Sequence, residues 1–167
     1  MARTVEKLDP HHPDWPCFLA VLDEVEQKDA VSNTHFMPFP RHFLAARLDG
    51  KIVGGLFFVV WEIGPHDRRQ PTIEADGVAL TEAKIIAFGV KKAYRRRGVG
   101  RALQEETIRK ARDLGCYQVR SVSQYARSEN HRLKLAMGFA VEPMERETPS
   151  VAFVMPLRAV DGAEQKG

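Results

Sequence analysis

The sequence predicts a mixed α/β (α+β) fold around a central, largely antiparallel sheet. Three observations support this fold class. The dipeptide Asp49-Gly50, between two runs of β-forming residues, predicts a hairpin. An apolar strand pattern over 84–90 leads through a basic turn into a helical pattern over 99–114. Short strand patterns then surround a further helix, so the order is strand, helix, loop, three strands, helix, strand, helix and two strands.

The first forty residues predict one strand and one helix. Residues 4–8 form a candidate strand that ends before an Asp-Pro pair. Asp14 is a candidate N-cap, and Pro16 is tolerated in the first helical turn. Apolar residues at helical spacing continue this helix to the neighbourhood of Lys28, and we expect 29–41 to be a loop with one helical turn.

The clearest hairpin pairs 42–48 with 51–61 across Asp49-Gly50, a dipeptide that favours a type I′ turn. The segment 64–83 follows it and is rich in turn-forming residues. A second Asp-Gly pair at Asp76-Gly77 predicts that this segment holds a small extra hairpin or a lid.

The second half of the chain alternates helices and strands. The helix over 99–114 ends before Gly115, a typical residue just past a helix C-terminus, and the next helix ends before Gly138. Apolar or small residues fall on one face of the helix over 99–114, with Ile108 on its flank: Val99, Leu103, Thr107, Ala111 and Leu114. The remaining elements are a strand at 117–123, a helix at 129–137, and strands at 139–141 and 151–157.

The composition is that of one globular domain. Of 167 residues, 44% are hydrophobic and 28% charged, so we expect a single domain over 1–157 and a disordered tail over 158–167. The longest apolar run, 52–61, is too short to span a bilayer, and the N-terminal residues lack an apolar signal core. Two cysteines, Cys17 and Cys116, suggest a reducing compartment, and we therefore expect a cytoplasmic protein without membrane attachment.

The strand at 84–90 runs into a helix through Arg95-x-x-Gly98-x-Gly100, which predicts a phosphate-binding turn. Backbone N–H groups at a helix N-terminus have no intrahelical partner, and the helix dipole favours an anion there. Glycines allow close approach of a phosphate, and guanidinium groups match its oxygens. The candidate residues of this turn are Arg95, Arg96, Arg97, Gly98, Val99, Gly100 and Arg101.

The positive charge is local, which favours a small anion over a nucleic acid as ligand. The net charge is only +3, and much of the positive charge lies in 91–101. A nucleic-acid interface needs an extended basic face with interleaved aromatic residues, and the sequence offers one short cluster. Metal binding is not expected either, because His11-His12 lie adjacent in a loop without the spacing that aims two histidines at one ion.

The stretch 90–100 resembles the acetyl-CoA-binding motif of the GNAT N-acetyltransferase superfamily, with Lys92 where proline is common. Downstream, 130–139 resembles a second motif of the same superfamily. Leu133, Gly138 and Phe139 fit that motif, whereas Lys134 stands where its tyrosine is expected. The resemblance extends over roughly 40–157, including the order of strands and helices.

The resemblance implies a GNAT-like fold, with a sheet of about seven strands, splayed fourth and fifth strands, and about four flanking helices. Acetyl-CoA is then the expected co-substrate. Its pantetheine arm would lie along Phe88, Gly89 and Val90, and a backbone N–H near Val90 would stabilise the oxyanion. Asn130 is a further candidate for cofactor binding, one helical turn beyond the asparagine position of the family.

The catalytic residues are less clear, because the strand glutamate of many members is replaced by Lys84. Glu82, two residues earlier on the same strand face, and Glu62, at the end of the preceding strand, are candidate bases that act directly or through water. Tyr125 is the first candidate acid and Tyr94 the second. A thiolate also leaves readily without an acid, because thiol pKa values are about 8.5. The alternative roles are ordinary ones, with the carboxylates at the surface and Tyr125 in packing.

Two functions follow from the resemblance. The first is acetyl transfer to an amine of a small molecule or a peptide, by direct transfer. The second is a non-catalytic acetyl-CoA-binding module, suggested by Lys84 and Lys134. A homodimer is also possible by resemblance. Acidic residues that would favour a cationic acceptor gather in the 64–83 segment: Asp67, Glu74, Asp76 and Glu82.

Overall fold

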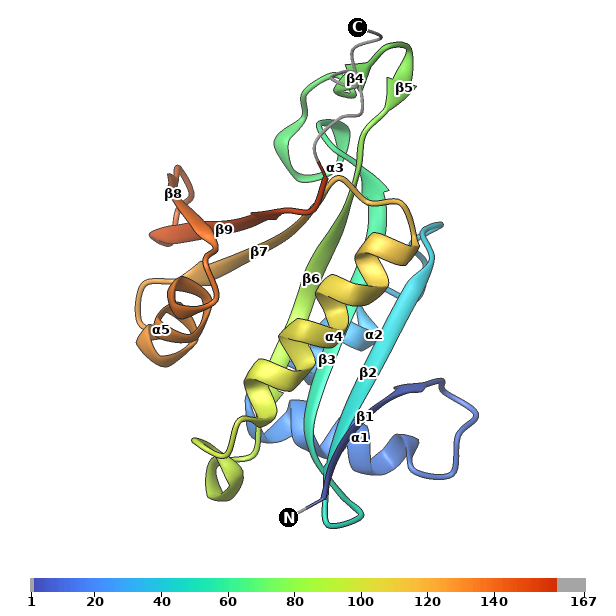
Figure 1. Ribbon diagram of the computed structural model, residues 1–167, viewed down its shortest axis with the longest axis vertical. Coiled ribbons are helices and arrows are strands. Elements are labelled where there is room, and N and C mark those ends of the chain that lie inside the picture. Colours follow the sequence, from blue (N-terminus) through green and yellow to red (C-terminus); the bar gives the residue numbers. More distant parts are fainter. Residues whose placement is uncertain (1, 159–167) are drawn as a thin grey trace, which may run out of the picture. The chain divides into compact units, whose positions relative to one another are not determined.

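The computed structural model describes residues 2–158 (Figure 1). The described strands form a seven-stranded sheet in the order β1-β2-β3-β6-β7-β9-β8 and a separate pair, β4-β5. The chain divides into two compact units. Among the described residues, the first unit comprises 2–59 and 85–107, and the second comprises 60–84 and 108–158.

The first unit is an antiparallel sheet of β1 (Arg3–Leu8), β2 (Arg41–Leu48), the greater part of β3 (Lys51–Glu62) and the end of β6 (Thr81–Val90). The turn between β2 and β3 has positive φ at Asp49 (49°) and Gly50 (80°), as a type I′ turn requires. The predicted hairpin is therefore confirmed. Its register places Phe43 opposite Phe57, and both rings are buried and stacked 4.7 Å apart.

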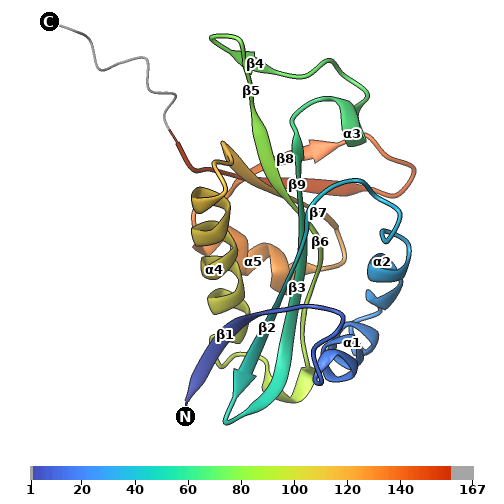
Figure 2. The ribbon, with the colours of Figure 1, turned by 90° about the vertical axis from the view of Figure 1, so that its right-hand side faces the viewer.

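Helices cover both faces of this sheet. Figure 2 shows α1 (Trp15–Glu24) and α2 (Lys28–Ser32) on one face and α4 (Val99–Asp113) on the other. Two adjacent glycines of β3 allow both contacts. A Cβ at Gly54 would lie 2.8 Å from Val99 of α4, and a Cβ at Gly55 would lie 3.0 Å from Phe18 of α1. Because neighbouring residues of a strand face opposite sides, one Gly-Gly pair lets two helices approach the same strand.

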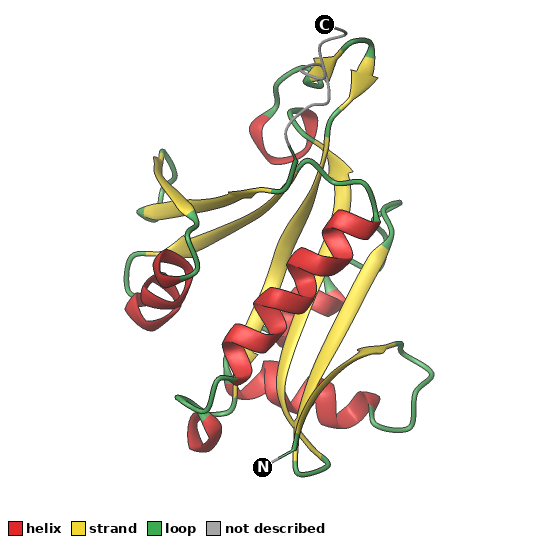
Figure 3. Cartoon of the chain, viewed as in Figure 1, coloured by secondary structure: helices red, strands yellow, loops and turns green. Residues whose placement is uncertain are grey.

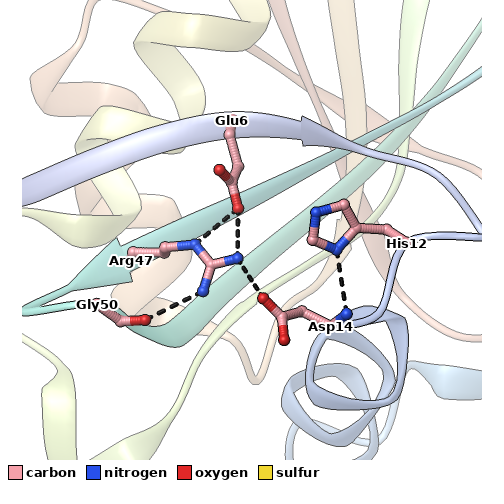
Figure 4. A network of polar contacts seen from close by, with 5 residues as sticks. All are labelled: Glu6, His12, Asp14, Arg47 and Gly50. Atoms are coloured by element: carbon pink, nitrogen blue, oxygen red, sulfur yellow. Dashed lines mark hydrogen bonds and ion pairs between the residues drawn. The ribbon is translucent and has the colours of Figure 1, made fainter.

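A charged network fixes the start of α1 to this sheet (Figure 4). Arg47 of β2 donates from Nε to Glu6 of β1 at 2.7 Å, from NH2 to Asp14 at 2.6 Å, and from NH1 to the Gly50 carbonyl at 3.0 Å. The hydrogen bonds to Asp14 and Glu6 raise the pKa of Arg47. His12 accepts the N–H of Asp14 through Nδ1 at 3.0 Å, so this histidine serves the local turn.

The second unit holds the end of β3, α3 (Pro65–Arg68), β4 (Glu74–Ala75), β5 (Val78–Ala79) and the start of β6. It continues with the end of α4, β7 (Gln118–Gln124), α5 (Ser128–Ala136), β8 (Ala140–Met144) and β9 (Ser150–Pro156). Strand β9 pairs antiparallel with β7 and with β8, and Phe153 lies opposite Ser121 on one side and Val141 on the other.

Most predicted elements are present, including a small hairpin in the 64–83 segment, formed by β4 and β5 (Figure 3). Its turn residues Asp76 (51°) and Gly77 (75°) both have positive φ. The helix predicted to run to about Leu114 ends one residue earlier, at Asp113. Leu114 lies just beyond it and is 46% exposed, because the chain turns at Gly115.

The first helix is shorter than predicted. It ends at Glu24, and Glu26 adopts a left-handed conformation with φ 60°. The N–H of Glu26 bonds to the Asp23 carbonyl and the N–H of Gln27 to the Leu22 carbonyl, the two bonds of a Schellman C-cap. Such caps usually carry glycine, and its absence here explains why the sequence did not reveal the helix end. The short helix α2 then forms the one helical turn that was predicted within the loop at 29–41.

Within residues 2–158, no helix combines the length and hydropathy needed to cross a bilayer. Nearly all of the tail predicted for 158–167 lies outside the described residues.

Candidate functional site

The turn between β6 and α4 leads into the N-terminus of a 15-residue helix. The N–H of Lys91 bonds to the Val53 carbonyl of β3, and a single 3₁₀ turn, η1 (Lys92–Tyr94), follows. Arg96 (64°) and Gly98 (75°) then take positive φ before α4 begins at Val99. The first N–H groups of α4 have no intrahelical partner by their position. The predicted strand, glycine-bearing turn and helix thus form the backbone of an anion-binding site.

Guanidinium groups surround this turn. Arg95 donates from Nε to the Val90 carbonyl at 3.2 Å, which holds it against the end of β6. The guanidinium of Arg97 lies 5.5 Å from the centre of the Tyr94 ring. Arg101 forms an exposed ion pair with Glu105 at 3.5 Å, and such pairs contribute little to stability. All three arginines therefore remain able to turn toward an anionic ligand.

Arg3 is an additional arginine that sequence reasoning missed. It lies on β1, and its NH1 donates to the Arg97 carbonyl at 3.3 Å. A Cβ at Gly98 would lie 2.3 Å from the same nitrogen, so glycine leaves room for the guanidinium. No local motif predicts this contact, because it spans more than half of the chain.

The end of α1 approaches the end of β6 at three points. Glu24 accepts the N–H of Lys92 at 2.8 Å. Val25 packs on Gly89 so closely that a Cβ there would lie 2.4 Å from a Val25 methyl carbon. Gln27 exchanges two hydrogen bonds with the backbone of Phe88, at 2.9 and 3.0 Å. Gly89 was predicted to mark a close approach, and its neighbour in the structure is a side chain of α1.

Glu82 lies in a dense polar cluster of the second unit. Its Oε1 accepts from Trp61 Nε1 at 2.9 Å and from Arg120 Nε at 3.0 Å. Its Oε2 accepts from Gln118 at 2.7 Å and lies 3.6 Å from the guanidinium of Arg68. Glu82 and Arg120 are each 1% exposed. A carboxylate with both oxygens engaged and its charge compensated is poorly suited to take a proton, and these contacts favour a structural role.

Two further catalytic candidates, Glu62 and Tyr125, are exposed. Glu62 ends β3 and accepts a hydrogen bond from the hydroxyl of Thr72 at 2.7 Å, which leaves its other oxygen at the surface. Tyr125 follows β7 and is 57% exposed. Its environment is thus not that of a packing residue.

Asn130 and His131 of α5 both contact Ser123 of β7. Asn130 Nδ2 donates to the Ser123 hydroxyl at 3.4 Å, and His131 Nε2 lies 3.1 Å from the same oxygen. Asn130 Oδ1 is buried without a hydrogen-bond partner among the described residues. An unsatisfied buried oxygen is a potential acceptor for a ligand donor.

Lys134 is a residue of α5, and its side chain is fully buried. Its Nζ donates to the Ser121 hydroxyl at 2.6 Å and lies 5.5 Å from the centre of the Phe153 ring. Burial, with a smaller effect of the nearby Lys84, lowers the pKa of Lys134 to about 7. The residue that stands where the family motif has a tyrosine is therefore an amine that changes charge near neutral pH.

The predicted residues fall into two groups. Those at 88–101 lie together in the first unit. Glu62, Glu82, Tyr125 and Asn130 belong to the second unit, where Glu82 and Asn130 join separate polar clusters. Within the described part of the chain, no group of three or more potential metal ligands gathers at one point.

Comparison with known proteins gives a family match and several similar structures. The model of the acetyltransferase (GNAT) family matches residues 9–139. The ribosomal-protein-S18-alanine N-acetyltransferase of Escherichia coli is 15% identical, with a TM-score of 0.70 over 97% of this chain and 98% of that chain. NAA60 of Arabidopsis thaliana in complex with acetyl-CoA is 17% identical, with a TM-score of 0.68 over 93% and 99%.

A third similar structure is a GNAT family acetyltransferase from Elizabethkingia anophelis with acetyl-CoA bound. It is 16% identical, with a TM-score of 0.62 over 93% of this chain and 98% of that chain. At such identities, structural likeness shows a common fold. A search of curated protein sequences finds no match.

Proposed function

The chain belongs to the acetyltransferase (GNAT) family, and from that premise we infer that it moves an acetyl group from acetyl-CoA to an amine by direct transfer. The observation that carries this inference is the turn from β6 into α4, with the N–H groups of a helix N-terminus and exposed guanidinium groups. These groups suit the diphosphate of acetyl-CoA. The residues that we propose for this role are Arg95, Arg96, Arg97, Gly98, Val99, Gly100 and Arg101.

The thioester end of acetyl-CoA is proposed to lie along the end of β6. Amides of the pantetheine arm can bond to strand backbone as a neighbouring strand would. We therefore propose Phe88, Gly89 and Val90 as its partners. A backbone N–H of this stretch would donate to the thioester oxygen as negative charge develops there. Asn130 is a further candidate, supported by its unsatisfied Oδ1.

The chemical step requires a neutral amine. The amine nitrogen attacks the thioester carbon, the C–S bond breaks, and the thiolate of CoA leaves. Of the candidate bases, Glu62 is favoured over Glu82 because one of its oxygens stays at the surface. Glu62 would take the amine proton directly or through water. Tyr125, which is exposed, remains the proposed donor to the thiolate.

The acceptor is proposed to be a peptide amine or a small cationic amine. The Escherichia coli structure described above is of an enzyme that acetylates an alanine of ribosomal protein S18, which supports a peptide acceptor. Acidic residues of the β4–β5 region, Glu74 and Asp76, would attract a positive charge. A comparison of N-terminal peptides, polyamines and neutral amines as acceptors distinguishes these classes.

A specific observation keeps the non-catalytic alternative open. Lys84 and Lys134 stand at the two family positions and both are buried, so neither position carries an accessible acid or base. Glu82, two residues before Lys84, is held by hydrogen bonds and ion pairs. That alternative predicts acetyl-CoA binding without release of CoA from any amine mixture.

The experiment that tests the proposal combines calorimetry with a CoA-thiol release assay over a broad amine panel. We expect acetyl-CoA binding and acceptor-dependent thiol release. Binding without release would favour the non-catalytic module. A protein that binds neither acetyl-CoA nor CoA would contradict both functions.

A further inference from the structure

The carboxamide of Gln27 occupies a backbone hydrogen-bonding position on β6. Phe88 N–H donates to Gln27 Oε1 at 2.9 Å, and Gln27 Nε2 donates to the Phe88 carbonyl at 3.0 Å. The N–H and C=O of one strand residue point to the same side, where a neighbouring strand normally pairs with them. A primary amide carries the same donor and acceptor as a peptide group. The Gln27 side chain therefore does for Phe88 what a strand would do.

Side chains also satisfy the backbone immediately beyond. Two residues after Phe88, the carbonyl of Val90 accepts from Arg95 Nε at 3.2 Å, and residues two apart in a strand present their backbone groups to the same edge. This edge of β6 is thus covered by groups that can rotate away. Backbone that is covered in this way can bind an extended, amide-containing ligand by exchange of hydrogen bonds.

The attachment of Gln27 favours rotation of its side chain over movement of the helix. The Schellman bonds of Glu26 and Gln27 fix the backbone at the end of α1. The bond from Lys92 N–H to Glu24 and the packing of Val25 on Gly89 hold the same helix end to β6. Only the carboxamide needs to leave Phe88, through rotamer changes that are fast compared with catalysis.

We propose that Gln27 is an internal competitor of acetyl-CoA. In the empty enzyme its carboxamide binds the backbone N–H and C=O of Phe88, and it rotates away when the pantetheine arm binds there. This inference rests on the proposed function. It makes Gln27 a residue that sets the affinity for the co-substrate. Binding of the arm exchanges two existing hydrogen bonds, so removing the carboxamide should leave the ligand with less to displace.

The test measures acetyl-CoA affinity by calorimetry for the wild type, Gln27→Met and Gln70→Met. Methionine has a similar length but forms no amide bonds. Gln70, an exposed glutamine after α3, is the matched control. We expect acetyl-CoA to bind Gln27→Met about tenfold more tightly, since two net hydrogen bonds are worth about that factor or more. Gln70→Met should bind as the wild type does.

A second ligand locates the effect. 3′-Phospho-ADP carries the diphosphate but lacks the pantetheine arm, so Gln27→Met should bind it with wild-type affinity. An equal gain for both ligands would point to a general change at the turn and overturn the proposal.

A measurement on the wild type avoids dependence on variant folding. The side-chain NH₂ signals of Gln27, identified by standard resonance assignment, should show slow hydrogen exchange in the empty protein. Saturating acetyl-CoA should shift them and accelerate their exchange. Signals that stay unchanged at saturation would overturn the proposal, whatever the variants do.

The outcomes separate this inference from the proposed function. A wild type that binds acetyl-CoA, with equal or weaker binding by Gln27→Met, overturns the inference and leaves the function standing. Binding by Gln27→Met alone supports a competitor that dominates in the wild type. Absence of binding in both removes the proposed function and the inference with it.

Discussion

Individual charged side chains in the second unit differ in how their charge is compensated. Lys134 and Glu82 are both buried, but Glu82 meets Arg120 directly, whereas Lys134 donates to the neutral hydroxyl of Ser121 and lies near a second lysine, Lys84. Burial and the like charge of Lys84 both disfavour the protonated amine of Lys134. We therefore expect substitutions of these two residues to have opposite effects on the stability of the protein.

Replacement of Lys134 by methionine should stabilise the protein at neutral and lower pH. The pKa of Lys134 is about 7 in the folded protein and about 10.4 in an unfolded chain. The unfolded state therefore binds more protons between these values, and the wild type gains stability as the pH rises from about 7 to 10. Below pH 7 the penalty, on the order of a few kcal/mol, is fully present. The charged neighbour that contributes to this shift of the pKa is Lys84 of β6.

The measurement is urea unfolding of the wild type, Lys134→Met and the exposed control Lys7→Met at pH values between about 6 and 10. The first variant should lose the rise in stability above neutral pH, and the control should keep it. A parallel rise in all three proteins would contradict the assigned environment of Lys134.

Glu82 and Glu62 should respond differently to replacement by glutamine. Glu82→Gln leaves the buried Arg120 without its counter-charge and should cost about 3–5 kcal/mol of unfolding free energy. Glu62→Gln should leave stability within about 0.5 kcal/mol of the wild type and lower kcat, because its exposed oxygen is the favoured base. Unfolding curves and steady-state kinetics check both. Full kcat in Glu62→Gln would exclude it as the base.

At the scale of elements, the packing of α1 on β6 depends on a glycine. Gly89→Ala places a methyl group 2.4 Å from a Val25 methyl carbon, so it should cost about 1–3 kcal/mol of unfolding free energy. Val25→Ala should remove most of that cost in the double variant. The double-mutant cycle, measured by denaturant unfolding, should therefore show coupling of about 1 kcal/mol or more. Additive effects would mean that Gly89 is needed for a reason other than this contact.

Across the whole molecule, the sequence predicts what local chemistry determines. Asp49-Gly50 specifies its turn, and the glycine-bearing segment before Val99 specifies the entry into α4. Contacts between distant segments could not be predicted from the sequence. Arg3 reaches Gly98 only because β1, β2, β3 and β6 lie in that order, and Gln27 reaches Phe88 only because a non-glycine Schellman cap ends α1 early. Neither contact is indicated by the spacing of residues or by the composition.

The distribution of charge over the chain leads to a last prediction. The net charge is only +3, yet arginines gather at the turn before α4, so attraction of a polyanionic co-substrate should be local and sensitive to salt. Raising NaCl from about 50 to about 500 mM should weaken acetyl-CoA binding several-fold. Arg97→Gln should weaken binding at low salt and flatten this dependence. Arg109→Gln removes the same charge further along α4, where Arg109 pairs with Asp113 at 2.8 Å, and should change neither. Equal effects of the two substitutions in calorimetry would mean that overall charge, and not the turn, attracts the ligand.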